Sequence, residues 1–297
     1  IYSEYGTLNI ESSLLKGNLA TRGGGIAGSY APAYVQNTTI TENDAYSVGG
    51  GVYLYYATDS ELLNCTVSEN VSNLDLVGNE EGGGIASHFE TLTLVNSIVD
   101  ENVRNTDDGF SFESNLNGTF DTAESWNNLI GASWANLVGG VNGNQVGADA
   151  QLEPLAFRGG PTQTMSIPFT SPAVDAGNDA LAVAAGLGTD QRGRDRYVDG
   201  DRAGGDTVDI GAYEYDPPPT VGAWMRLPDP NERPDLLNEL RFYYTEAVDT
   251  LVGNDLLTVY NDTTGAPESL PGTIVHGPTL LTLYLDVPLA PAYYTFR

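Results

Sequence analysis

The chain has 297 residues, and its 40 acidic residues against 12 basic ones give a formal net charge of −28. A surface this acidic repels phosphate, so we expect neither nucleic acid nor an anionic membrane as a partner. One cysteine, Cys65, excludes a disulfide framework within the chain, and two histidines exclude a His-rich metal site. No apolar run approaches the roughly 20 residues of a membrane span, so insertion into a membrane is not expected.

Two features recur through the first 102 residues. Glycine triplets begin at Gly23, Gly49 and Gly82, with spacings of 26 and 33 residues. The second feature is a unit ending on asparagine, in the forms IESSLLKGN, VQNTTITEN, LLNCTVSEN and LVNSIVDEN, at Asn18, Asn43, Asn70 and Asn102. A period in the twenties to low thirties, with β-branched runs and no helical pattern, predicts stacked parallel strands in a solenoid over residues 1–130.

The repeat also predicts which side chains stack. The expected inward-facing residues are Val35, Ile40, Leu62, Val67, Leu92, Leu94 and Val99. Asparagine at a recurring corner tolerates the left-handed backbone region, and its amide can bond to the equivalent asparagine of the next repeat. The glycine triplets permit positive φ and close approach of neighbouring repeats. Cys65 aligns with Thr38 and Ser97, which predicts a buried, unreactive thiol.

Irregular segments follow. The insertion between Asn70 and Gly82 is expected to be a solvated loop, although insertions in solenoids often gather on the binding face. Residues 131–216 are expected to form a cap with an acidic loop, because the apolar end of a solenoid needs cover. A stiff spacer is predicted at Pro217, Pro218 and Pro219. Beyond it, alternating runs such as LRFYYTEAV and LLTLYLDVPL predict a small antiparallel sandwich over residues 217–297.

The order of several motifs carries a family resemblance. GGGI and NSIV repeats are followed by NNLIG, then SPAVDAG at 171–177, DQRG at 190–193 and DIGAYE at 209–214. This order resembles right-handed parallel β-helix proteins of bacterial surfaces, in particular proteins with a choice-of-anchor Q region. The resemblance implies a pectin-lyase-like fold, secretion and display on the cell envelope, with no generally established catalytic activity. The runs FYYTEAV and PLAPAYYTF are similar to Ig-like domains of surface-layer and adhesin-type proteins.

Acidic residues are densest near the end of the expected cap. DGD at 199–201 and GGD at 204–206 resemble calcium loops, in which carboxylates alternate with glycine. The expected Ca²⁺ ligands are Asp195, Asp199, Asp201, Asp206 and Asp209. The alternatives are a solvated acidic loop and pairing of these carboxylates with nearby arginines. We expect ion pairs of this kind to hold the cap together through Arg158, Arg192 and Arg194. Binding of an acidic sugar by these arginines is the alternative.

Tyrosines recur just past the glycine triplets. Tyr30, Tyr53, Tyr55 and Tyr56 occupy related positions of adjacent repeats and are the candidate ligand-binding residues. Stacked aromatic rings on one face could form a carbohydrate platform, or could stack only to stabilise the solenoid.

The repeats show no convergent set of carboxylates and no catalytic motif, so we expect no catalytic residues. The predicted protein is therefore an all-β, non-catalytic, secreted or cell-surface protein for display, adhesion or carbohydrate binding. Its expected partners are an extracellular polysaccharide or a cell-envelope component. The alternative is a polysaccharide lyase or glycoside hydrolase acting in the groove of the solenoid.

Overall fold

The computed structural model describes residues 1–77, 82–133 and 135–217, together with the backbone of the strands between 221 and 296. The chain divides into two compact units, Ile1–Pro217 and Pro218–Arg297. Within the described residues, the one α-helix, α1 (Asp179–Ala184), is short, and no helix is long and apolar enough to cross a membrane. The regular structure of the described residues is thus almost entirely β, in agreement with the predicted all-β class.

Short parallel strands build most of the first unit, and each repeat contributes one strand to each sheet. One face contains β1 (Tyr2–Glu4), β5 (Ile26–Ser29), β9 (Val52–Tyr55), β13 (Ile85–Val95) and β17 (Leu116–Phe120). The next contains β2 (Leu8–Glu11), β6 (Ala33–Gln36) and β10 (Glu61–Leu63), which joins the long strand β13. The third contains β3 (Leu14–Lys16), β7 (Thr39–Thr41), β11 (Thr66–Ser68), β14 (Ile98–Asp100), β18 (Leu129–Ile130) and β19 (Gln145–Val146). The last contains β4 (Leu19–Ala20), β8 (Asp44–Ala45), β12 (Val71–Ser72), β15 (Val103–Asn105) and, antiparallel, β16 (Ser111–Glu113).

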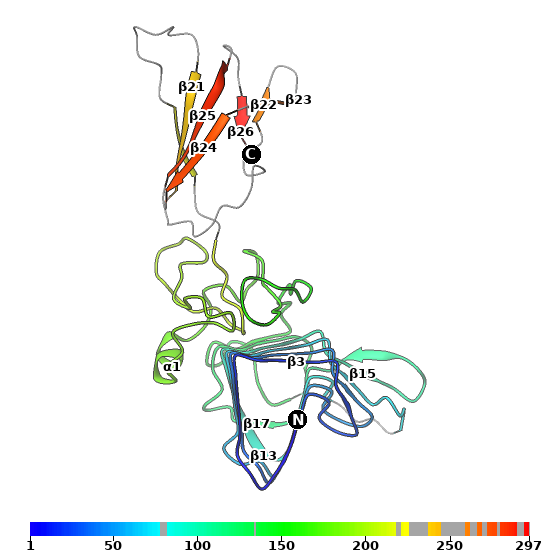
Figure 1. The fold of residues 1–297 in the computed structure, drawn as a ribbon. Helices are drawn as coiled ribbons and strands as arrows, with labels where there is room; N and C mark the ends of the chain where they lie inside the picture. Colours follow the sequence, from blue (N-terminus) through cyan, green and yellow to red (C-terminus); the bar gives the residue numbers. More distant parts are fainter. Residues whose placement is uncertain are drawn as a thin grey trace. The chain divides into compact units, whose positions relative to one another are not determined.

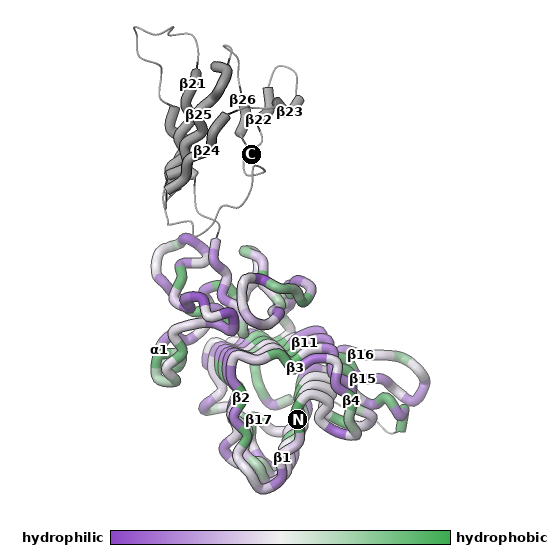
Figure 2. The backbone as a smooth tube through the Cα atoms, in the orientation of Figure 1, coloured by the Kyte–Doolittle hydropathy of each residue, from purple (hydrophilic) through white to green (hydrophobic). Residues whose placement is uncertain are grey.

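The register of these strands follows the sequence repeat. Leu62 pairs in parallel with Val35 of the preceding repeat and Leu94 of the following one. Seen along the stacking direction, the repeats superimpose, with β3, β13 and β17 marking their sides (Figure 1). Hydrophobic strand segments alternate with hydrophilic corners (Figure 2). This nearly closed arrangement of parallel strands is compatible with the predicted solenoid.

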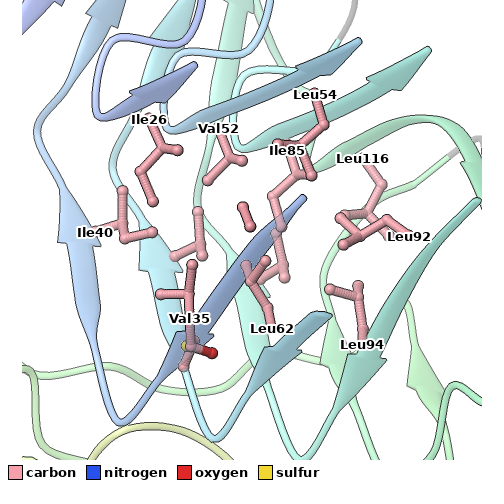
Figure 3. Packing of buried hydrophobic residues seen from close by; sticks show 14 of the residues in the cluster. Ile26, Val35, Ile40, Val52, Leu54, Leu62, Ile85, Leu92, Leu94 and Leu116 are labelled. Carbon is pink, nitrogen blue, oxygen red and sulfur yellow. The ribbon is translucent and has the colours of Figure 1, made fainter. Parts of the chain in front are cut away.

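The enclosed side chains form one hydrophobic core. All the residues predicted to face inward are fully buried in it, which confirms that part of the repeat alignment; they are Val35, Ile40, Leu62, Val67, Leu92, Leu94 and Val99. Figure 3 shows most of them meeting Ile26, Val52 and Ile85 from the first face. Cys65 is also fully buried in this core, and burial raises the pKa of its thiol to about 12. The predicted burial of this thiol is therefore confirmed.

The asparagine ladder is confirmed in detail. The side-chain amide of Asn43 donates to Oδ1 of Asn70 at 3.0 Å, and that of Asn70 donates to Oδ1 of Asn102 at 2.8 Å. The ladder asparagines themselves do not adopt the left-handed conformation. That conformation falls on the residue before each, with φ of 56° at Glu69 and 59° at Glu101, and at an earlier corner on asparagines such as Asn64.

The glycine triplets allow neighbouring repeats to touch. A Cβ at Gly50 would lie 2.4 Å from the carbonyl oxygen of Gly83 and 2.5 Å from that of Val71. Gly49, just before it, has a φ of 69°. A larger residue at Gly50 would therefore push adjacent backbones apart, and one at Gly49 would be strained by its positive φ and by the carbonyl oxygen of Val52, 2.4 Å from an added Cβ.

The segment expected to cap the end of the stack divides into two parts that lie in different places. Residues 135–146 close the end, because Leu137 packs into the main core and β19 adds a last strand beside β18. Residues 148–215 instead lie along the side of the stack, over the outer face of the sheet that contains β7, β11 and β14. There Ile98 and Leu129 point outward and pack against Ile167 and Ile210.

Polar contacts fasten this lateral segment at the corner before β7, β11 and β14. The guanidinium of Arg196 donates to Oδ1 of Asn37 at 2.7 Å. Asn64 donates to the carbonyl oxygen of Asp209 at 3.3 Å, and Oδ1 of Asn96 accepts from the Asn178 backbone at 2.7 Å. Asparagines that the repeat places at one corner thus hold a distant part of the chain.

The second unit consists of antiparallel strands. One sheet has the order β20 (Val221–Met225), β21 (Leu237–Tyr244), β25 (Leu280–Leu289) and β24 (Gly272–Gly277). The other has the order β23 (Ala266–Glu268), β22 (Val259–Asn261) and β26 (Tyr294–Phe296).

Replacing a central rung of the asparagine ladder tests its contribution to stability. Besides bonding to Asn102, the amide of Asn70 donates to the carbonyl oxygens of Ile40 and Ser68, each at 2.9 Å. We expect Asn70→Ala to lower the free energy of unfolding by about 3 kcal/mol, because buried acceptors lose their donor. Asn18→Ala, at the exposed end of the ladder, should cost less than about 1 kcal/mol. If the two substitutions lower the free energy of unfolding in urea equally, burial of the ladder is not what makes its central rung important for stability.

Candidate functional site

Exposed aromatic rings form a column along one corner of the first unit. Tyr5, Tyr30, Tyr56 and Phe89 follow β1, β5, β9 and part of β13 at equivalent positions. Successive ring centroids lie 5.5, 5.2 and 4.9 Å apart, with interplanar angles of 14°, 2° and 10°. All four backbones are left-handed, with φ between 48° and 69°. Such a conformation is uncommon for bulky residues.

The stacking determines what the column can bind. Tyr30 and Tyr56 each stack on a ring above and a ring below, so both faces of each ring are already covered. A sugar needs a free aromatic face, and in this column such faces remain only at its ends, on Tyr5 and Phe89. Mutual stacking contributes about 0.5–1.5 kcal/mol per pair, which offsets part of the backbone strain of about 1–3 kcal/mol at each of these corners. The stabilising role therefore accounts for Tyr30 and Tyr56.

Tyr53 and Tyr55 lie beside the column on the outer face of β9, and they line a cleft. The cleft has a volume of about 870 Å³, and Tyr2, Ala27, Ser29 and Arg22 line it as well. The guanidinium carbon of Arg22 lies 5.6 Å from the centroid of the Tyr53 ring, within the range of a cation–π contact. An open cleft that combines tyrosine rings with polar groups such as Arg22 and Ser29 can hold a small ring-shaped ligand.

The structure brings together all four tyrosines that the sequence singles out. Tyr55 packs edge-on against Tyr30 and Tyr56 at 5.9 and 4.7 Å, and stacks against Tyr53 at 6.3 Å. Sequence reasoning missed Tyr2, Tyr5, Phe89 and Arg22. The column residues do recur with the spacing of the glycine triplets, so an alignment of all repeats could have found Tyr5 and Phe89.

The predicted acidic loop is brought together only in part. Asp199 and Asp201 lie with Asp175, and carboxylate oxygens of the three lie within 4.8 Å of one another. Oδ2 of Asp199 accepts the Gly204 N–H at 3.1 Å, whereas Oδ1 is buried without a hydrogen-bond partner in the part of the chain that the structure describes. Sequence reasoning missed Asp175, because it lies in the SPAVDAG motif, 24 residues before Asp199.

The other predicted calcium ligands lie outside this group. Asp195 accepts the N–H of Tyr197 at 3.2 Å, and Asp206 is exposed. Asp209 is fully buried, where its carboxylate accepts backbone N–H groups of Asp175 and Tyr215. Burial raises the pKa of Asp209 to about 7. Its oxygens are engaged in holding the lateral segment together.

The three arginines of the expected cap form ion pairs with carboxylates, as predicted. Arg192 forms a buried ion pair with Asp190 at 2.7 Å and lies 3.7 Å above the Tyr213 ring. Arg158 pairs with Glu153 at 3.0 Å, and Arg194 lies 3.7 Å from a carboxylate oxygen of Asp216. The DQRG and DIGAYE motifs thus meet in one polar cluster that ties the lateral segment together.

A second groove, of about 770 Å³, is acidic. Its lining carboxylates come from successive repeats and from the start of the lateral segment: Glu69, Asp100, Glu101, Glu113 and Asp149. The expectation that the repeats lack a convergent set of carboxylates is therefore wrong. Glu69 and Glu101 precede ladder asparagines, and the recurring Glu-Asn pair was a visible signal. Glu113 and Asp149 lie outside the regular repeat, so only the tertiary structure brings them to the groove.

Asp100 is the most perturbed carboxyl group of this groove. It accepts backbone N–H groups of Glu101 at 2.9 Å and Ala150 at 2.8 Å. Burial, with a further contribution from the nearby charges of Glu113 and Glu101, raises its pKa to about 6 from an ordinary 3.8. Near neutral pH this group can therefore hold or release a proton.

The raised pKa of Asp100 predicts a pH effect on stability. Between pH 4 and pH 6 the folded protein holds a proton at Asp100 that the unfolded chain has already released, so this group makes the protein less stable as the pH rises. We expect the fall in unfolding free energy from pH 4 to pH 7 to be smaller in Asp100→Asn than in the wild type, by about 2 kcal/mol. The control Glu124→Gln, at an exposed position, should leave the fall unchanged. An unchanged pH dependence in Asp100→Asn would contradict the assignment.

No protein-family model matches this chain, and no match was found among curated proteins or among solved structures. These comparisons give no support to a choice-of-anchor Q relationship. Arguments about function therefore start from the geometry described above.

Proposed function

We propose that this chain is a non-catalytic, secreted or cell-surface protein that binds polysaccharide through the cleft lined by Tyr53 and Tyr55. The cleft beside the aromatic column is the observation that carries this proposal. Aromatic rings pack against the apolar faces of sugars, and the column holds the neighbouring corner rigid. The parallel strands of the first unit form, in this proposal, a right-handed β-helix of the pectin-lyase-like type.

The rest of the chain fits a role in display or adhesion. The resemblance of SPAVDAG, DQRG and DIGAYE to choice-of-anchor Q proteins favours a place on the cell envelope. The antiparallel second unit is in this proposal an Ig-like sandwich, separated by the proline run as a spacer. A net charge of −28 favours solubility and suits surroundings rich in cations.

Binding to sugars is tested with cellohexaose, mannohexaose, chitohexaose and guluronate hexamer, by isothermal titration calorimetry. We expect at least one of them to bind, and Tyr55→Ala to weaken that binding by about tenfold, because a wall of the cleft is lost. Tyr46→Ala removes an exposed tyrosine outside the cleft and should have no effect. If none of the four hexamers binds the wild-type protein, the proposed function is wrong.

The acidic groove favours a second candidate function, a glycoside hydrolase or polysaccharide lyase. Hydrolysis of a glycosidic bond needs a protonated carboxyl group and a second carboxylate across the bond. Asp100, with its pKa of about 6, suits the first role, and Glu101 or Glu113 suits the second. Release of reducing ends or unsaturated products from the same hexamers would favour this candidate over simple binding.

We also propose that Asp175, Asp199 and Asp201 bind Ca²⁺, which prefers carboxylate oxygens. Neutralising this group of like charges would stabilise the loop that contains Asp199 and Asp201. The buried Oδ1 of Asp199 supports the proposal because it lacks another partner among the described residues.

Calcium binding is checked by thermal unfolding. We expect millimolar Ca²⁺ to raise the Tm of the wild type and to leave that of Asp199→Asn unchanged, because only a bound ion stabilises the folded state. Asp206→Asn, in the same loop but outside the group, should keep the full response. A response lost equally in both variants would point to general screening of charge instead.

A further inference from the structure

The last residues of the first unit are buried just before the chain passes into the second unit. Asp209, Ile210, Ala212 and Glu214 are each at most 1% exposed, and the first unit ends at Pro217. Residues 209–215 are called the exit segment below. Because the chain is continuous at Pro217, tension between the two units acts directly on the exit segment.

Backbone groups of the exit segment bond to two successive repeats of the stack. The Ala212 N–H donates to the Thr66 hydroxyl at 3.0 Å, and the Gly211 N–H donates to the Asn96 carbonyl oxygen at 2.8 Å. Thr66 lies on β11, and Asn96 lies at the corner before β14 of the next repeat. A pull on the exit segment therefore acts on both repeats together.

Charged groups of the lateral segment hold the exit segment as well. The Arg192 guanidinium donates to the Glu214 carbonyl oxygen at 2.5 Å, and the Glu214 N–H donates to Oδ2 of Asp190 at 3.1 Å. Arg196 donates to the Glu214 carboxyl group at 3.4 Å. All of these residues are at least nine-tenths buried, and hydrogen bonds in such surroundings are stronger than in water.

Gly211 lets the exit segment lie directly against the stack. An added Cβ would be 2.7 Å from Cδ1 of Ile98 and 3.1 Å from the Thr66 hydroxyl oxygen. The φ of Gly211 is 109°, which is strained for any residue with a side chain. Even one methyl group at this position would separate the exit segment from the stack.

We infer that the exit segment is a mechanical latch, which transmits tension from the second unit to the stack and keeps the lateral segment from peeling away. This inference rests on the proposed role in display or adhesion, in which a protein is pulled through its domains. In a solenoid each repeat contacts only its neighbours, so a pull on one end can remove repeats singly. Bonds to two repeats and to a buried charged cluster must instead break together.

Two matched pairs of variants test the latch. Thr66→Val removes the hydroxyl that accepts from Ala212. Thr41→Val, on the same sheet, removes a buried hydroxyl that has no hydrogen-bond partner among the described residues. Gly211→Ala places a methyl group against the stack, whereas Gly204→Ala carries similar strain, with φ of 98°, and meets no described atom within 4 Å.

Detachment is measured on the 297-residue chain, held by its two termini in optical tweezers at constant force. Release of residues 148–215 should lengthen the wild-type chain in a single step of up to roughly 220–250 Å, because an extended chain spans about 3.3–3.6 Å per residue. The Tm of each variant verifies that it is folded.

We expect Thr66→Val and Gly211→Ala to detach about tenfold faster than the wild type at the same force, because a buried donor loses its acceptor or a close contact is opened. Thr41→Val and Gly204→Ala should stay within about twofold of the wild type. Lengthening of the wild type in many small steps, or equal rates in all four variants, would overturn the latch. The result is independent of sugar binding: a failed hexamer titration rejects binding in the cleft, whereas the detachment rates alone decide the latch.

Discussion

Each repeat of the first unit must satisfy polar groups that stacking removes from water. At one corner, an asparagine amide reaches a carbonyl group of its own repeat, a carbonyl group of the preceding repeat and the next asparagine. Asn70 meets three acceptors in this way while its own oxygen accepts from Asn43. A buried polar group without a partner is costly, so this constraint restricts the corner residue far more than the core restricts its aliphatic residues.

The same physics governs the outside of the stack. The sheet with β7, β11 and β14 presents Thr39, Thr66 and Ile98 outward, and none of them is left to solvent. The lateral segment covers them with matching groups: Gln191 accepts from the Thr39 hydroxyl, and the Thr66 hydroxyl accepts from the backbone of Ala212. The DQRG and DIGAYE motifs of this segment are thereby explained by attachment.

The faces that remain uncovered differ in chemistry. One corner carries a column of aromatic rings in strained backbone conformations, and Tyr2, Tyr53 and Tyr55 line the cleft beside it. Another corner gathers glutamates that precede ladder asparagines, which makes an acidic groove. Because the repeats stack in register, equivalent corner residues of successive repeats lie side by side. A residue type that recurs at one corner position therefore forms a continuous surface of one chemical kind. Surfaces of opposite chemical character can therefore coexist on one framework.

The sequence by itself determined the parallel stacking, the inward residues and the ladder, because period and residue type repeat together and each repeat needs its neighbour. It also singled out the tyrosines of the cleft and two of the three clustered aspartates. Only the tertiary structure decided that residues 148–215 lie along the side, that Asp175 joins Asp199, and that Glu113 and Asp149 reach the groove of Glu69 and Glu101. These contacts join residues that no periodic pattern relates, and they form because an outward apolar face must be covered by whichever distant segment complements it.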